Sequence, residues 1–350
     1  MEKTNKVLTV VVPTYNMEKY LNRCLDSLIV SDEQMQQLEV LVINDGSKDS
    51  SSQIAHEYQD RYPDTFRVID KENGNYGSCI NRGLAEATGK YIKVLDADDW
   101  FDNGNLVLFL KKLTEFEADL FITNFQIVNE KNTITRSVSY DYPPNKKLSI
   151  DFLCEMQSFR SLNMHSVTYN AENLRLIGYK QSEGISYTDQ EWMFLPMSTV
   201  HTVVYLDLFI YQYLVGREGQ TMMPEVLKKS IGHTIKGVFV MIEEFEKVKG
   251  DKNAVYFEGR ILHRLEYIYK TSLVEKRGLE TDELIKFDSH LRKISLYFYE
   301  CAGLKNIHQH FAFQYVNWWR RNGYKKIPTS VLMYNKFLEK IVGIKTRLLS

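Results

Sequence analysis

The sequence predicts an α/β protein, in which a mostly parallel central sheet covered by helices on both faces precedes a helical C-terminal region. Two patterns support this prediction. From residue 7 to residue 128, apolar runs rich in β-branched residues alternate with amphipathic helical patterns, as in sheets built from strand–helix units. From residue 226 onwards, leucine, isoleucine and aromatic residues recur at helical spacing with almost no proline.

Five apolar runs are expected to form the strands of the sheet. Val7–Val12 shows no polar alternation, which is typical of a strand buried on both faces. The other four runs are Leu38–Ile43, Phe66–Ile69, Tyr91–Leu95 and Asp119–Val128. Helical patterns fill the intervals between them, with apolar residues recurring every three or four positions.

The middle of the chain is expected to be more varied. Residues 130–148 are polar and rich in turn-forming residues, so we expect a surface loop there. Val203–Leu214 is expected to form a further strand. We place the domain boundary near Pro224, so that the first domain covers residues 1–224 and the helical region covers residues 225–350.

Composition and charge narrow the class of protein. The 350 residues include 44% apolar and 25% charged residues, which is typical of a globular chain. Four cysteines without a CxxC pair, no signal peptide and no run long enough to cross a membrane favour a cytoplasmic protein. Residues 226–350 hold 23 Lys and Arg against 13 Asp and Glu, whereas residues 1–225 hold 21 against 32. An acidic first part suits a cation-assisted site and argues against nucleic-acid binding.

Polar segments follow the first four predicted strands. They are Pro13, Thr14, Tyr15 and Asn16; then Asn44–Ser47; then Asn73–Gly77; then Asp96–Asp99. Ligands of parallel sheets bind outside the carboxyl ends of the strands, so these segments are expected to line one crevice. Turn formation alone explains any single segment, but it explains all four together poorly.

Asp96 and Asp98 are the best candidates for a metal site. Side chains two apart in an extended segment point to the same side, and two such carboxylates need a cation or a proton between them. Mn²⁺ or Mg²⁺ with a bound diphosphate would satisfy this need. The alternative is that Asp96, Asp98 and Asp99 cap the following helix or form a turn.

Two further side chains in these segments suit a nucleotide. Asp45 follows a buried strand and can accept hydrogen bonds from a ribose or a base, although it is also the first residue of an Asp-Gly turn. Tyr15 can stack on a base or belong to the core. No GxGxxG or Walker loop is present, which argues against an NAD-binding or P-loop protein.

These segments resemble the family 2 inverting glycosyltransferases in order and spacing. The matching runs are Val10–Asn16, Val42–Asp49, Asn81–Gly83 with Gly89–Tyr91, and Leu95–Asp99. The resemblance covers about residues 7–128 with high specificity and extends more weakly to about residue 222. It implies the GT-A fold, with a Rossmann-like nucleotide-sugar half at about residues 1–128 and an acceptor half at about residues 129–224.

The resemblance also implies roles for individual residues. Asp98 would ligate the metal, and the residues expected to bind the nucleotide-sugar are Pro13, Thr14, Tyr15, Asn16, Asp45, Asn73, Gly77, Asp96, Ala97, His165 and Arg217. Purely structural roles for His165 and Arg217 remain the alternative. The catalytic base would be Asp189, although Thr188 stands where glutamate is more usual, with Glu191 as the second candidate. Ile80 replaces a family arginine, whose role is therefore lost here.

The predicted reaction is metal-dependent, inverting transfer of a single sugar from a nucleoside-diphosphate sugar, with a UDP-sugar favoured, to a hydroxyl of a glycan or lipid-linked acceptor. Inversion needs one base on the acceptor hydroxyl and charge stabilisation of the leaving diphosphate. By resemblance, the context is assembly of a bacterial surface glycan. A non-catalytic nucleotide-sugar-binding or scaffold protein and, more weakly, a nucleotidyltransferase are the competing interpretations.

The C-terminal tail is basic and amphipathic. Its apolar residues fall on one helical face: Tyr334, Phe337, Leu338, Ile341, Ile344 and Leu348. Such a helix can lie on the inner face of the cell membrane as a peripheral contact. It can equally dock onto the helical region or onto a sister subunit of a homo-oligomer.

Overall fold

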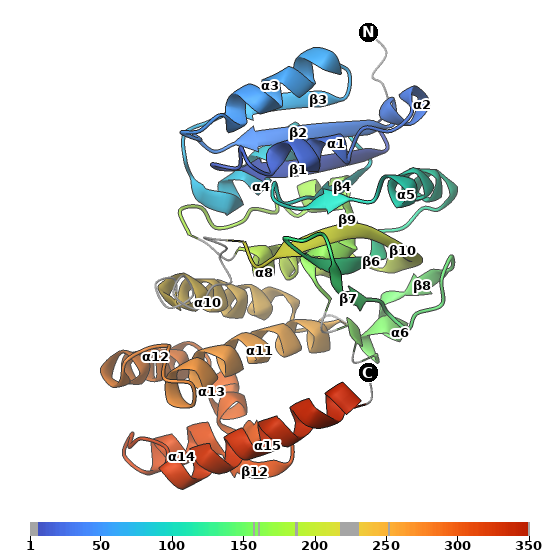
Figure 1. The fold of residues 1–350 in the computed structure, drawn as a ribbon. Helices are drawn as coiled ribbons and strands as arrows, with labels where there is room; N and C mark the ends of the chain where they lie inside the picture. Colours follow the sequence, from blue (N-terminus) through green and yellow to red (C-terminus); the bar gives the residue numbers. More distant parts are fainter. Residues whose placement is uncertain are drawn as a thin grey trace. The chain divides into compact units, whose positions relative to one another are not determined.

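A ten-stranded mixed sheet is the centre of the N-terminal part of the chain (Figure 1). The computed structural model describes residues 6–156, 158–159, 162–185, 188–217, 231–250 and 253–348, with side chains to residue 341. Backbone contacts divide the chain into two compact units. The first comprises Met1–Gln220 with Gly250–Tyr256, and the second Thr221–Lys249 with Phe257–Ser350. Pro224, where the sequence places a boundary, lies outside the described residues.

Four parallel strands form the first half of the sheet, in the order β3-β2-β1-β4. They are β1 (Leu8–Thr14), β2 (Leu38–Asn44), β3 (Phe66–Asp70) and β4 (Tyr91–Val94). Every residue of β1 and β2 is buried, as expected for apolar runs without polar alternation. The carboxyl ends of these strands therefore lie along one edge of the sheet.

The second half of the sheet is mixed. The order continues from β4 as β9-β6-β10-β5, and β9 (Val167–Asn170) is antiparallel to both of its neighbours. The other strands are β5 (Trp100–Phe101), β6 (Leu120–Asn129), β7 (Ile134–Val138), β8 (Lys147–Ser149) and β10 (Thr202–Val215). The surface loop expected at residues 130–148 is thus partly wrong, because β7 pairs with β6 while its side chains stay exposed.

Helices cover both faces of the parallel strands. Helices α1 (Leu21–Asp26), α3 (Ser51–Arg61) and α5 (Asn103–Glu115) share one apolar core with Leu8, Val10 and Val12 of β1. Helix α4 (Asn75–Glu86) packs on the other face, where Gly83 lies against Val11. The remaining helices and 3₁₀ turns of this unit are short: α2 (Asp32–Met35), α6 (Ile150–Cys154), η2 (Met164–Ser166), α7 (Ala171–Leu176), α8 (Asp189–Trp192) and η3 (Leu195–Thr199).

The C-terminal unit is mostly helical, as predicted. Its helices are α10 (Ile231–Val248), α11 (Ala254–Leu273), α12 (Thr281–Ile294), α13 (Leu296–Gly303), α14 (Tyr315–Arg321) and α15 (Thr329–Leu348). A buried ion pair between Arg320 and Asp288, with an N–O distance of 2.7 Å, joins α14 to α12, and the hydroxyl of Tyr269 donates to the same carboxylate.

A short pair of strands lies among the helices of this unit. Strands β11 (Asn306–His308) and β12 (Phe311–Gln314) form a small antiparallel hairpin. In β12, half-buried Phe311 and Phe313 alternate with exposed residues, a period of two that is typical of a strand. Among the described residues, no helix has the combination of length and apolar composition that crossing a bilayer requires.

We expect Gly83→Ala to lower the free energy of unfolding by about 1–3 kcal/mol, because overpacking a filled interface forces neighbours to shift. The added methyl group would lie 2.5 Å from Cγ1 of Val11. Urea unfolding followed by circular dichroism measures the loss, and Val11→Ala in the same chain should restore part of it. Gly104→Ala in α5 is the matched control, because its nearest neighbour would lie at 3.5 Å. Equal stability of Gly83→Ala and the wild type would contradict the close packing.

Candidate active site

Hydrogen bonds join the loops that follow β1 and β2. The backbone N–H of Asn16 donates to Oγ of Ser47 at 3.0 Å, and the N–H of Lys48 donates to Oδ1 of Asn16 at 2.8 Å. Asn16 has a φ of 55°, a left-handed conformation that asparagine tolerates better than most residues. Tyr15 beside it is 46% exposed, so it does not belong to the core. Its ring is therefore accessible for stacking.

Asp45 is buried and joins the second loop to the third. Its Oδ1 accepts hydrogen bonds from Nζ of Lys71 at 2.5 Å and from the N–H of Gly74 at 2.9 Å. Its backbone carbonyl accepts from the side-chain amide of Asn73 at 3.0 Å. These contacts orient the carboxylate, and they place the cation of Lys71 beside it.

The first turn of α4 connects Asp45 to the acidic loop after β4. Gly74 donates to Asp45, and two residues later the hydroxyl of Tyr76 donates to Oδ1 of Asp96 at 2.9 Å. The segments after β2, β3 and β4 therefore form one hydrogen-bonded edge of the sheet, as the topology of parallel strands requires.

The three carboxylates after β4 have different partners. Oδ2 of Asp98 accepts a hydrogen bond from Nε of Arg217 at 2.5 Å, in a pair whose side chains are 10% and 13% exposed. Asp99 is buried and accepts from the hydroxyl of Tyr211 and from the N–H of Leu214, both at 2.7 Å. Arg217, one of the residues expected to bind the nucleotide-sugar, thus contacts the acidic loop through Asp98.

Burial and the neighbouring carboxylates raise the pKa of Asp96 and of Asp99. Burial, and then the charge of Asp98, raises the pKa of Asp96 to about 7. Burial, followed by the charges of Asp98 and Asp96, raises the pKa of Asp99 well above its usual range. Arg217 therefore does not neutralise all the negative charge that these carboxylates can carry. A bound cation would reduce the repulsion between them.

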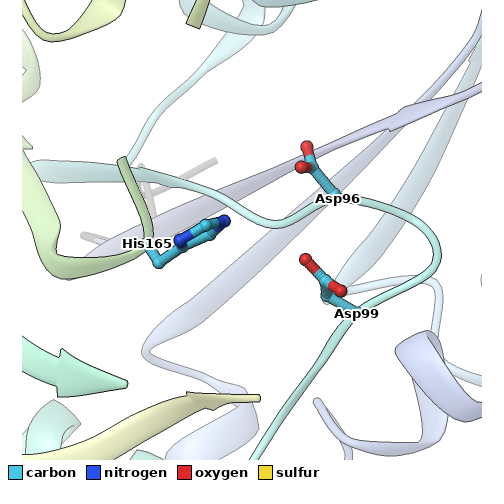
Figure 2. A group of neighbouring side chains, drawn as sticks. All are labelled: Asp96, Asp99 and His165. Carbon is cyan, nitrogen blue, oxygen red and sulfur yellow. The ribbon is translucent and has the colours of Figure 1, made fainter. Parts of the chain in front are cut away.

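His165 completes a cluster with Asp96 and Asp99. One ligand atom from each of the three residues lies within 4.8 Å of the others. Figure 2 shows the two carboxylates on one loop, with the His165 ring directed toward them from a separate segment. Burial, and then the charge of Lys93, lowers the pKa of His165 to about 3, so the imidazole is neutral. Its Nδ1 is buried and has no hydrogen-bond partner among the described residues.

The donor atoms present suit a divalent cation. Carboxylate oxygens are the ligands that Mg²⁺ and Mn²⁺ prefer, and a neutral imidazole also suits Mn²⁺. The unpartnered nitrogen of His165 and the raised pKa of Asp96 are both consistent with a missing positive charge at this point. Asp96, Asp98, Asp99 and His165 are therefore the residues that could hold a metal.

Asp189, the expected base, begins helix α8 and accepts a hydrogen bond from Nε2 of Gln190. Its charge contributes to raising the pKa of Asp96 and of Tyr76, so it lies near both. Glu191 is 7% exposed, and its carboxylate accepts from the N–H of Ser182 at 2.7 Å. Of the two candidates, Asp189 is thus the one near the acidic loop, and Glu191 supports its own loop.

Helix α4 also holds the segment that precedes Asp189. The amide of Asn81 exchanges hydrogen bonds with the backbone of Gln181 in both directions, at 3.0 and 2.8 Å. Gly77 is buried against the carbonyl of Ser182, where a Cβ atom would collide. Gly77 therefore faces this segment. Because glycine has no side chain, the backbone at Ser182 can approach it closely.

Several residues of the site were not predicted from the sequence. Lys71 pairs with Asp45, Tyr76 with Asp96, and Tyr211 with Asp99. Lys93 is fully buried in β4 and donates to the carbonyls of His165 and Val167 at 2.8 and 3.2 Å. The sequence did contain a sign of the Lys93 contacts, namely a lysine within an otherwise apolar strand, because a buried ammonium group needs acceptors close by.

The sequence of this chain is similar to those of known proteins. The family model described as Glycosyl transferase family 2 matches residues 9–168. Glycosyltransferase GlyA of Streptococcus pneumoniae is 30% identical over 222 residues, which are 60% of this chain and 31% of GlyA. The minor teichoic acid biosynthesis protein GgaB of Bacillus subtilis is 22% identical over 306 residues, which are 84% of this chain and 32% of GgaB. The chain thus spans about a third of the length of these two relatives.

Solved structures show the same fold. TarS 1-349 of S. aureus, crystallised in complex with UDP-GlcNAc, superposes with a TM-score of 0.62 at 20% identity, covering 82% of this chain and 80% of that chain. At this identity the likeness concerns the fold alone. The GT-A architecture predicted from the sequence, with a helical C-terminal region, is confirmed.

We expect Lys93→Met to change how stability depends on pH. Burial lowers the pKa of Lys93 from 10.5 to about 7. As the pH falls from about 10.5 to about 7, the unfolded chain takes up a proton that the folded chain does not, so the wild type loses stability relative to the variant. Below about pH 7 the difference should level off. Urea unfolding across this range measures it, with Lys131→Met at an exposed turn as control; a difference independent of pH would contradict the burial argument.

Proposed function

We propose that this chain, whose residues 9–168 match the model of Glycosyl transferase family 2, transfers a single sugar with inversion from a nucleoside-diphosphate sugar to a hydroxyl acceptor. The observation that carries the proposal is the continuous hydrogen-bonded edge from Asn16 through Asp45 and Asp96, with Asp189 near Asp96. It brings a polar edge of the sheet, an acidic loop and a candidate base together.

The donor nucleotide is assigned to the first two loops. Exposed Tyr15 offers a ring on which a base can stack, and Asp45, oriented by Gly74, offers an acceptor to a ribose or to a base N–H. Pro13 and Thr14, which end β1, and Asn16 and Asn73, in the loops at the same edge of the sheet, are assigned to the donor as well. A UDP-sugar is favoured, and the fold neighbour TarS was crystallised with UDP-GlcNAc. The donor half then corresponds to residues 1–128, and the acceptor half to residues 129–224.

The diphosphate is assigned to the acidic loop. Asp98 would hold Mn²⁺ or Mg²⁺ with Asp96 and His165 nearby, and the backbone of Ala97 would lie against the donor. The cation supplies charge neutralisation for the departing diphosphate. Because Arg217 pairs with Asp98, we propose that it releases this carboxylate and turns to the diphosphate when donor and cation bind.

Asp189 is proposed to remove the proton of the acceptor hydroxyl. Inverting transfer requires one such base, on the face of the sugar opposite the leaving group, and no second nucleophile. Asp99 is poorly suited to act as a nucleophile, since Tyr211 and Leu214 donate hydrogen bonds to its two oxygens and burial favours its protonated form. The arrangement therefore favours a single displacement.

The acceptor is proposed to be a glycan or a lipid-linked glycan in the assembly of a surface polymer. The printed name of GgaB refers to teichoic acid biosynthesis, which supports this class of product. The cytoplasmic location and the homo-oligomer expected from the sequence stay predictions. A non-catalytic scaffold of the same fold is the alternative, and it predicts donor binding without release of the nucleoside diphosphate.

We expect Asp189→Asn to reduce sugar transfer by about 10²–10⁴-fold, because the amide cannot accept the hydroxyl proton. Donor affinity should stay close to that of the wild type. Release of UDP measures transfer, and a thermal shift with the donor measures binding. Glu191→Gln is the control, since Glu191 is buried and holds Ser182 instead. Equal loss of binding and transfer in Asp189→Asn would assign it a structural role.

We expect a UDP-sugar with Mn²⁺ to raise the melting temperature by at least about 2 °C, and more than GDP- or dTDP-sugars do. Asp98→Asn should lose the part of this rise that depends on Mn²⁺. In Arg217→Ala, Asp98 lacks its cationic partner, so Mn²⁺ alone should stabilise the protein while the donor response falls. Arg82→Ala, which removes a surface pair with Glu86, is the control. A Mn²⁺ response in Asp98→Asn equal to that of the wild type would exclude Asp98 as the ligand.

A further inference from the structure

A continuous aromatic surface lies on the C-terminal unit, over the hairpin β11–β12 and the helices α14 and α15. Its members, called here the aromatic face, are Phe311, Phe313, Trp318, Tyr334 and Phe337. Ring contacts connect them in series: Trp318 to Phe313 at 6.1 Å, Phe313 to Phe311 at 5.7 Å, Phe311 to Tyr334 at 5.0 Å, and Tyr334 to Phe337 at 6.4 Å between centroids. The hairpin, α14 and α15 are drawn in the red part of Figure 1.

Helix α15 exposes large apolar side chains. Met333, Tyr334 and Phe337 are 67%, 48% and 57% exposed, whereas Asn335 is 1% exposed. At 100° per residue, the three exposed side chains form one stripe along the helix and Asn335 lies roughly opposite to them. A helix that merely docks onto its own domain buries such a stripe. None of the described residues of this unit therefore covers the exposed stripe.

The charge around the aromatic face is mostly positive. Between Leu304 and Lys340 the sequence has seven Lys and Arg and a single acidic residue, Glu339. Arg320 is buried in its pair with Asp288 and Lys305 pairs with Glu266 at 3.6 Å, which leaves five exposed cations, Arg321, Lys325, Lys326, Lys336 and Lys340. Glu339 lies near Nζ of Lys270, at 3.7 Å, and accepts a hydrogen bond from buried Asn335, so it is paired within the unit. Lys336 and Lys340 flank Phe337 on α15, are exposed, and form no ion pair with described residues. The surface is therefore apolar and cationic at once.

We propose that the aromatic face binds the surface of an anionic lipid bilayer. Aromatic side chains partition into the interface between headgroups and acyl chains, and lysines beside them attract anionic headgroups. A second copy of the chain fits the same face less well. A two-fold contact would bring Lys336 and Lys340 close to their own copies, and the repulsion would oppose association. The charge complementarity thus favours a lipid surface.

This inference goes beyond the proposed function and does not depend on it. Leu338 and Ile341, which the sequence places on the apolar face of the tail, are half-buried, while exposed Met333 lies on the same side as Tyr334 and Phe337. The side chains of Ile344 and Leu348 lie outside the described residues. The binding surface is thus assembled from a hairpin and two helices, instead of from the tail helix alone.

The test is flotation of the full chain with vesicles, without donor or metal. Vesicles are made of phosphatidylcholine alone or of an equimolar mixture with phosphatidylglycerol. We expect the chain to float with the anionic vesicles only, and less at high salt. Lys336→Gln with Lys340→Gln should lower the partition constant about thirty-fold, since each lysine near an anionic surface contributes about fivefold. Tyr334→Ser with Phe337→Ser should lower it by about tenfold or more.

The matched control is Lys286→Gln with Lys293→Gln, which removes the same charge from exposed positions of α12. It should bind as the wild type does. All substituted side chains are exposed, so folding should persist, and circular dichroism with melting curves verifies this. Equal binding to neutral and anionic vesicles, equal loss in the control, or no binding at all would overturn the proposal. Self-association that disappears in the Tyr334 and Phe337 variant would identify a second copy as the occupant instead.

Discussion

Three carboxylates in one buried loop impose the main constraint on this protein. Asp96, Asp98 and Asp99 lie at the end of β4, where burial and the neighbouring carboxylates raise the pKa of Asp96 and of Asp99. Each is held by a partner from a different part of the chain: Tyr76 from α4, Arg217 after β10, and side-chain and backbone groups of β10 for Asp99. The acidic loop is therefore stable only because α4 and the end of β10 converge on it.

Helix α4 connects the acidic loop to the rest of the site. Two glycines let it approach its neighbours closely, Gly83 against Val11 of the sheet and Gly77 against Ser182 of the segment before Asp189. Its first turn also holds Asp45, through Gly74. One helix thus sets the relative positions of Asp45, the acidic loop and the segment before Asp189. Catalytic groups need such preorganisation to act together.

Much of the site could be predicted because strand ends in a parallel sheet share one edge. Asp45, Asp96 and Asp98 were identified from their places after apolar runs, and the first two now join one hydrogen-bonded network. The contacts of Lys71 and Lys93 could not be predicted in this way. Each acts through an acceptor from another segment, and no periodicity links residues that only folding brings together.

The sequence by itself determined the order of the first four strands and of the helices between them, since burial periodicity is a local property, and its strand-end motifs match a family model over residues 9–168. Only the tertiary structure decided that Arg217 pairs with Asp98 across 119 positions, that a hairpin interrupts the C-terminal helices, and that Met333, Tyr334 and Phe337 face outward. Local sequence patterns indicate which side chains share a face of a helix or strand. Which neighbour covers that face, and which charge meets which, depends on packing between segments distant in the chain.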